Sequence, residues 1–115
     1  MKMNEYLFSY GTLQKKTVQL DLFGRILSGS VDVLRGYKIS TIEIADEAFL
    51  SKGEAKYQKT LLISNNERDR VNGMALEVTN DELLLADKYE PQNYKRVSVM
   101  LESGKKAWVY VDTEI

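Results

Sequence analysis

Short β-type segments separated by turn residues occupy most of this chain of 115 residues. The clearest pair lies at residues 95–101 and 106–111, because apolar and polar side chains alternate in the first segment and Ser103-Gly104 separates the two. That pattern predicts an antiparallel hairpin. Further strands are expected at residues 5–9, around 31–33 and 39–42 on either side of a bend at Arg35-Gly36, at 59–63, and at 71–78. Within the last of these, Gly73 predicts a close approach of a neighbouring backbone.

Only two segments show signals of a helix. Thr79 and Glu82 have the spacing of a capping box, and Pro91 disfavours helical angles at the residue before it, so a helix is expected from Thr79 to Tyr89 or Glu90. A shorter helix is expected after Thr17 and closed by Gly24. Residues 43–57 have no clear period and are expected to form a loop or flap. These elements predict one α+β domain over residues 1–115, a small, twisted, mostly antiparallel β-barrel with two short helices.

The chain contains no Cys and no His. This composition excludes Ser-His-Asp and Cys-His nucleophile pairs, thiolate–imidazole zinc sites, and haem or iron–sulfur ligand sets. Any proton transfer must therefore be carried out by carboxylates, Tyr, Lys or the backbone. No metal site is expected.

The charges argue against nucleic acid or membrane as a partner. The net charge is −1 and basic and acidic residues are interspersed, so no long basic field is available for phosphates. No apolar run approaches the ~20 residues of a membrane span. The apolar stretch at residues 6–8 is shorter than the ~7–15 residues of a signal-peptide core, so a cytoplasmic location is expected. The chain does not indicate an oligomeric state.

The segment Tyr10-Gly11-Thr12-Leu13 follows the first expected strand and precedes the first helix. A glycine there could take the positive φ that an anion-binding nest requires, and it leaves the backbone N–H groups unobstructed. A carboxylate-sized ligand would suit such a turn. The simpler interpretation is an ordinary connection between strand and helix.

Glu90 lies at the C-terminal end of the second helix, where the last carbonyls carry partial negative charge. Asp87 lies one turn earlier on the same face. Both neighbours disfavour the ionised carboxylate, which would make Glu90 a stronger general base. Alternatively, Glu90 belongs to a solvated helix end where these effects are screened.

Tyrosines are candidates to orient a polar substrate in a chain without His: Tyr10 opens the glycine turn, and Tyr94 and Tyr110 lie on the final hairpin. A hairpin loop of two or four residues would place Val97 opposite Tyr110. Tyr94 and Tyr110 would then reach one site only if a bulge intervened. Each tyrosine could instead be a core residue with its hydroxyl at the rim.

Five short motifs in this order resemble the gamma-glutamylcyclotransferase-like family, over about residues 5–111. They are Tyr10-Gly11-Thr12-Leu13, Gly36-Tyr37, Val71-Asn72-Gly73, Leu85-Ala86-Asp87-Lys88-Tyr89-Glu90, and Tyr94-Lys95-Arg96-Val97. Residues 10–34 are similar to bacterial members.

The resemblance implies a β-barrel-like fold and a cofactor-independent reaction. In it, Tyr10 to Leu13 would hold the α-amino-acid end of a γ-glutamyl group, Tyr94 would contribute to substrate binding, and Glu90 would be the acid/base. The α-amine attacks its own γ-carbonyl, and 5-oxoproline forms as the other amine leaves. Attack within one molecule has a high effective molarity, so neither His nor Cys is required.

The sequence also departs from the family pattern. Pro91 stands where relatives usually have Gly after the glutamate, and residues 40–56 lack the aromatic-Pro element of many relatives and carry Glu43, Asp46 and Glu47 instead. These departures keep an alternative open: a non-catalytic small-ligand binding or regulatory module of the same fold. A protein-interaction domain is a third alternative, for which a large exposed apolar patch would be the sign.

Overall fold

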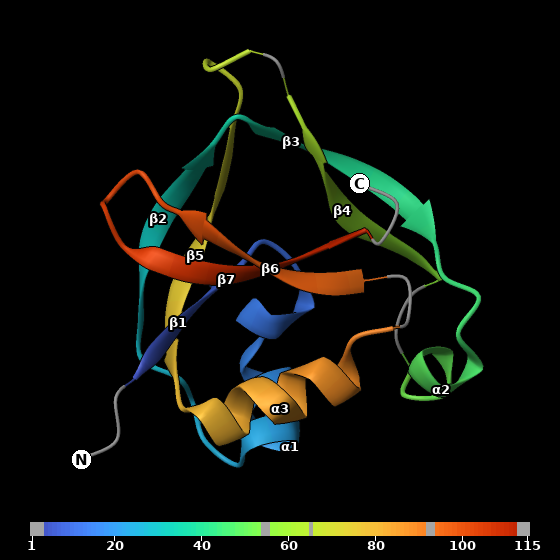
Figure 1. Cartoon of the computed structure of the whole chain (residues 1–115). Coiled ribbons are helices and arrows are strands. Elements are labelled where there is room, and N and C mark those ends of the chain that lie inside the picture. The colour runs from blue at the N-terminus through green and yellow to red at the C-terminus, as the bar shows by residue number, and fades with distance from the viewer. Residues whose placement is uncertain (1–3, 54–55, 65, 92–93, 113–115) are drawn as a thin grey trace.

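The structure is a computed structural model that describes residues 4–53, 56–64, 66–91 and 94–112. Seven strands are interspersed with short helices along the described chain (Figure 1). In chain order they are β1 (Glu5–Ser9), the 3-10 helix η1 (Thr12–Gln14), α1 (Lys16–Phe23), β2 (Gly29–Arg35), β3 (Tyr37–Glu43), α2 (Glu47–Leu50), β4 (Tyr57–Ile63), β5 (Arg70–Val78), α3 (Asn80–Tyr89), β6 (Tyr94–Met100) and β7 (Lys106–Asp112).

The main sheet has five strands in the order β2-β5-β1-β7-β6. Its neighbouring strands are antiparallel except at the centre, where β1 and β7 run parallel with Leu7 beside Trp108. Strands β3 and β4 form a separate two-stranded antiparallel sheet. The prediction of an α+β fold is confirmed. The main sheet is mixed, because it contains the parallel β1–β7 pair among antiparallel pairs.

The predicted closure into a barrel is wrong. Strands β2 and β6 remain at opposite edges of the main sheet, because β3 and β4 pair with each other instead of joining it. The turn after β6 does reach β2, where the backbone N–H of Glu102 donates a 2.8 Å hydrogen bond to the carbonyl of Val33. This contact joins a turn to an edge strand and does not pair the two edges.

Both helices expected from the sequence are present. At α3, the Thr79 hydroxyl accepts from the N–H of Glu82 at 3.1 Å and the Glu82 carboxylate accepts from the N–H of Thr79 at 2.9 Å, which completes the predicted capping box. Helix α1 ends at Gly24, whose φ of +72° is the left-handed conformation that glycine adopts without strain.

A third helix, α2, lies inside the segment that was expected to be a loop, so the prediction of two helices is wrong. The Asp46 carboxylate caps α2 by accepting from the N–H groups of Ala48 and Phe49 at 3.0 and 3.4 Å. A helix of four residues is too short to show a hydrophobic period in sequence. Its burial of Phe49, which is 2% exposed, fixes it to the core. Across the described ranges, no helix is long and apolar enough to cross a membrane.

The two faces of the main sheet carry two separate cores, because neighbouring side chains of a strand point to opposite faces. Leu7 belongs to the core shared with α1 and α3, whereas Phe8 belongs to the core that includes Leu61 of β4. Figure 1 shows α1 and α3 on one side of the sheet and the β3–β4 hairpin on the other.

Gly73 is the predicted point of close approach between β5 and β1. A Cβ atom added there would lie 2.4 Å from the backbone oxygen of Ser9 and 2.7 Å from the Phe8 ring. Only glycine fits this position, so the prediction is confirmed. The close contact helps to fix the end of β1, from which the candidate site continues.

Candidate active site

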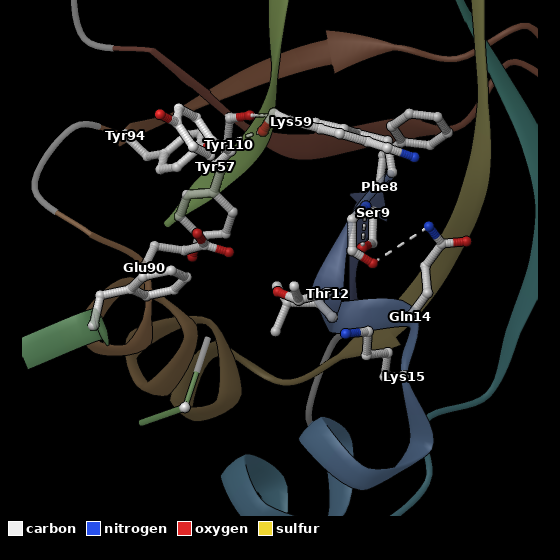
Figure 2. A pocket seen from close by; sticks show the side chains of 15 residues that line it. Phe8, Ser9, Thr12, Gln14, Lys15, Tyr57, Lys59, Glu90, Tyr94 and Tyr110 are labelled. Carbon is white, nitrogen blue, oxygen red and sulfur yellow. Dashed lines mark hydrogen bonds between the residues drawn. The ribbon is translucent and has the colours of Figure 1, made fainter. Parts of the chain in front are cut away.

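A pocket of about 510 Å³ opens where the chain leaves β1 and faces the ends of α3, β4, β6 and β7 (Figure 2). Small-molecule sites have volumes of about 300–1,000 Å³. The residues predicted from sequence for catalysis and binding all line this pocket: Tyr10, Gly11, Thr12, Leu13, Glu90 and Tyr94. The fold thus brings together segments about 80 residues apart, whereas the chemical role of each residue stays a prediction.

Glu90 directly follows α3 and is the residue that caps its C-terminal end. Its N–H still donates to the carbonyl of Ala86 at 3.0 Å, but its own backbone is extended, with φ −67° and ψ 143°, as the following Pro91 requires. Figure 2 shows its carboxylate pointing into the cavity between Tyr57 and Thr12. The residue is half-buried, so the carboxylate faces the pocket without leaving water entirely.

Asp87 has a different role from the one expected. Its carboxylate accepts hydrogen bonds from Arg96 Nε at 2.9 Å and from the Tyr110 hydroxyl at 2.7 Å. A second bond from the Arg96 guanidinium, at 3.1 Å, makes the ion pair bidentate. The charge of Asp87 is therefore balanced by Arg96, and Asp87 supports Tyr110 in the pocket wall.

The Tyr10–Leu13 loop does not have the backbone predicted for it. Gly11 has φ −139°, so the expected left-handed glycine is wrong, and the loop continues directly into η1. A Cβ added at Gly11 would meet nothing within 4 Å, so the backbone here borders open space. The Leu13 side chain is 3% exposed and packs in the core, which leaves only its backbone available to a ligand.

The start of η1 presents backbone donors at this loop. The N–H groups of Thr12 and Leu13 lie in the first turn, where no intrahelical acceptor exists. In the part of the chain that the structure describes, neither N–H donates to another protein acceptor. The Thr12 hydroxyl is held from the other side by the Tyr89 hydroxyl, at 3.3 Å.

Three of the four tyrosines that line the pocket are hydrogen-bonded to the protein through their hydroxyl groups. Tyr10 donates to the backbone carbonyl of Tyr110 at 2.6 Å, Tyr94 donates to the carbonyl of Lys59, and Tyr110 donates to Asp87. Burial is the main cause that raises the pKa of all three phenols, and the negative charge of Glu90 raises each further. All three therefore stay protonated at neutral pH.

The register of the final hairpin brings Tyr94 and Tyr110 to one face. Met100 pairs with Lys106, so the turn contains residues 101–105 and is odd in length. Arg96 consequently lies opposite Tyr110, and Tyr94, two residues from Arg96, points to the same side. The expectation that Val97 faces Tyr110 is wrong, and no bulge is needed.

Several lining residues were not proposed from the sequence, chiefly Lys15, Phe49, Tyr57 and Lys59. Lys15 lies two residues after the glycine motif, and this proximity was a usable signal, whereas the others come from α2 and β4, far away in sequence. Figure 2 shows the Lys15 ammonium directed toward Thr12 and the Lys59 side chain extending along the opposite side of the cavity. Neither lysine forms an ion pair with a described residue.

The described residues also gather no group of three or more carboxylates that could hold a metal ion. The chemistry available in the pocket is therefore that of one carboxylate, four phenols, two ammonium groups and backbone N–H donors.

Comparison with known proteins identifies both sequence and fold relatives. The sequence profile of the family described as "Gamma-glutamyl cyclotransferase, AIG2-like" matches residues 7–114. Two proteins of Arabidopsis thaliana with solution structures superpose with TM-scores of 0.75 and 0.72, each at 22% identity, over 99% and 96% of this chain. A protein titled "Gamma-glutamyl cyclotransferase" superposes with a TM-score of 0.72 at 17% identity, over 96% of this chain.

These structural relatives are longer than the present chain. It covers 65% of the first Arabidopsis protein, 69% of the second and 68% of the third structure. No curated protein sequence matches the chain significantly. At these identities, the structural likeness shows a shared fold.

Proposed function

The chain belongs to the Gamma-glutamyl cyclotransferase, AIG2-like family, and from that premise we propose that it converts a small γ-glutamyl amide or amine into 5-oxoproline and a free amine. Glu90 is the acid/base, and the Tyr10–Leu13 loop with Tyr94 binds the γ-glutamyl group. The observation that carries this proposal is the convergence of Glu90 and that loop on one pocket of suitable size.

The reaction proceeds within one substrate molecule. The Glu90 carboxylate takes a proton from the α-ammonium group, and the freed nitrogen attacks the γ-carbonyl carbon. A new C–N bond closes the five-membered ring. The old amide C–N bond then breaks as the protonated Glu90 gives its proton to the departing amine, and the ring nitrogen loses its second proton to the freed Glu90 carboxylate, which passes it to solvent. No water is consumed and no cofactor is required. Since both reacting groups belong to one molecule, the protein's main tasks are to fold the substrate and to move the proton.

The charges in the pocket suit a zwitterionic substrate. The ammonium group would lie at Glu90, while the α-carboxylate would meet the N–H groups at the start of η1 and the nearby ammonium of Lys15. Figure 2 shows the Glu90 carboxylate and the Lys15 ammonium on different sides of Thr12, an arrangement that supports binding of a substrate with separated charges. Open space at Gly11 would let the carboxylate approach the backbone.

A Glu90→Gln variant tests the proposal. Glutamine has the same shape but cannot accept the ammonium proton, so release of 5-oxoproline from a panel of γ-glutamyl amides should slow by ~10²–10⁴-fold. Binding of 5-oxoproline, measured by calorimetry, should persist. The matched control is Glu47→Gln, which removes an exposed carboxylate of α2 that does not line the pocket.

Two results would change this assignment. An unchanged rate in Glu90→Gln would remove Glu90 from the chemistry. Tight binding of γ-glutamyl compounds by the parent protein, without 5-oxoproline release, would support the alternative of a non-catalytic ligand-binding module.

A further inference from the structure

Tyr57 differs from the other tyrosines of the pocket in the state of its hydroxyl proton. The hydroxyls of Tyr10 and Tyr94 donate to backbone carbonyls, and the hydroxyl of Tyr110 donates to the Asp87 carboxylate. A phenol carries a single proton, so these three can offer a ligand only lone pairs. The Tyr57 hydroxyl lines the same pocket and forms no hydrogen bond with a described residue. Among the described phenols of the pocket, only Tyr57 therefore has a proton to donate to a ligand.

Tyr57 is held at the pocket although it is 63% exposed. It is the first residue of β4 and lies opposite Glu43 of β3. The Lys56 ammonium lies 5.9 Å from the centroid of its ring and forms an ion pair with Glu43 at 2.8 Å. Two residues further along β4, the Lys59 carbonyl accepts a hydrogen bond from β6, which ties the strand to the pocket wall. Figure 2 shows the Tyr57 side chain directed toward the Glu90 carboxylate.

The proposed reaction develops negative charge at this end of the pocket. Glu90 takes a proton from the α-nitrogen and gives a proton to the departing nitrogen, and in the tetrahedral intermediate both nitrogens are bonded to the γ-carbon. The oxygen on that carbon must consequently lie close to the Glu90 carboxylate. The N–H groups of Thr12 and Leu13 are assigned to the α-carboxylate of the substrate. A free donor beside Glu90 would stabilise the oxyanion, and Tyr57 has one.

We propose that Tyr57 is a further catalytic residue, whose hydroxyl donates a hydrogen bond to the γ-carbonyl oxygen as that oxygen becomes an oxyanion. When the α-nitrogen attacks, the π electron pair of the carbonyl moves onto the oxygen, and it returns when the bond to the leaving nitrogen breaks. Tyr57 keeps its proton throughout. The catalytic role rests on the proposed function, whereas donation to a ligand carbonyl follows from the free hydroxyl and can be measured without turnover.

The Tyr57→Phe variant removes the donor and keeps the ring. The kcat for release of 5-oxoproline should fall by roughly 10²-fold, the lower end of the range for one oxyanion donor, because the residue is open to water. KM should change little, since the hydrogen bond strengthens as charge develops. Tyr37→Phe is the matched control, because the Tyr37 hydroxyl has no described hydrogen bond and does not line the pocket. Thermal melting checks that both variants fold.

The pH dependence separates this role from an effect on Glu90. The rise of kcat with pH follows ionisation of Glu90, so Tyr57→Phe should lower the plateau of the profile and leave the midpoint of the rise in place. A loss that is recovered at higher pH would overturn the proposal, because Tyr57 would then act by changing the basicity of Glu90. A parent-like kcat in Tyr57→Phe would overturn it too, and the proposed function would stand.

A matched pair of ligands tests the donor without turnover. The compound 3-oxocyclopentane-1-carboxylate has the ring, carboxylate and carbonyl positions of 5-oxoproline, and cyclopentanecarboxylate lacks only the carbonyl. Calorimetry on the full chain should show that the parent protein prefers the ketone by roughly two- to tenfold, the range for one net hydrogen bond. Tyr57→Phe should abolish this preference and bind cyclopentanecarboxylate as the parent does.

The ligand pair also separates failure of Tyr57 from failure of the reaction. Equal affinities of the parent protein for the two ligands would overturn the proposal, as would a preference that survives in Tyr57→Phe. If the preference depends on Tyr57 but no γ-glutamyl compound yields 5-oxoproline, Tyr57 is a binding donor only, and the proposed reaction and its catalytic role are both overturned.

Discussion

The hydroxyl of Tyr10 donates a 2.6 Å hydrogen bond to the backbone carbonyl of Tyr110, which lies 100 residues further along the chain. Both residues are buried, at 7% and 6% exposure. This bond ties the first residue of the glycine motif to strand β7, which stands beside β1 in the sheet. Two walls of the pocket are thereby held at a fixed separation.

Tyr10→Phe removes this bond and leaves the Tyr110 carbonyl without its donor. The free energy of unfolding should fall by ~1–3 kcal/mol, the cost of an unsatisfied buried polar group. Urea denaturation measures the change. Tyr37→Phe is the control, because Tyr37 packs against the same core and no hydroxyl bond is described for it. Equal stability of the Tyr10→Phe and parent proteins would show that the bond contributes nothing net.

Gly11→Val should weaken ligand binding far more than stability. A Cβ at this position meets nothing within 4 Å, so the folded protein accommodates the side chain, but the methyl groups cover the backbone that a carboxylate would approach. Calorimetry with 5-oxoproline and L-glutamate, beside thermal melting, checks both parts. Gly11→Ala gives an intermediate step. Undiminished affinity in a folded Gly11→Val protein would place the ligand elsewhere.

Lys15→Gln and Lys59→Gln should each lower the affinity for L-glutamate by up to about fivefold, the range for a charge pair in contact with water. The effect should shrink at high salt, because exposed charges are screened. Lys16→Gln provides a matched control: Lys16 is the next residue along the chain and does not line the pocket. An equal loss in Lys16→Gln would mean that net charge, not position, is responsible.

Glu82 makes the stability of the fold depend on pH. The hydrogen bonds from Arg25 Nε at 2.8 Å and from its guanidinium terminus at 2.7 Å lower the pKa of this carboxyl, assisted by the capping bonds with Thr79. Because the folded-state pKa is depressed, the stabilisation is present above the unfolded value of ~4.3 and is lost as pH falls through the folded value.

Glu82→Gln should therefore lower the unfolding free energy at pH 7 and flatten its decline below about pH 4.3. Denaturation curves recorded between pH 7 and pH 3 measure both effects. Glu67→Gln, which removes an exposed carboxylate, is the control. A parent-like pH slope in Glu82→Gln would assign the acid sensitivity to other groups.

The sequence by itself determined the features that depend on neighbouring residues. The capping box of α3, the end of α1 at Gly24, the hairpin of β6 and β7, and the requirement for glycine at position 73 all follow from short-range geometry. The resemblance then pointed to the residues that meet in the pocket, although their roles remain to be tested.

Tertiary structure alone decided how these pieces combine. Strand order, the parallel β1–β7 pair and the open sheet depend on which faces are buried against which helices, and helix α2 exists because Phe49 is buried in the core. In the same way, Asp87 looked like a repelling neighbour of Glu90 in sequence, yet the fold brings Arg96 and Tyr110 to it. The physical reason is that these contacts join groups 9 to 100 residues apart, whose separation is fixed only when both faces of the sheet are packed.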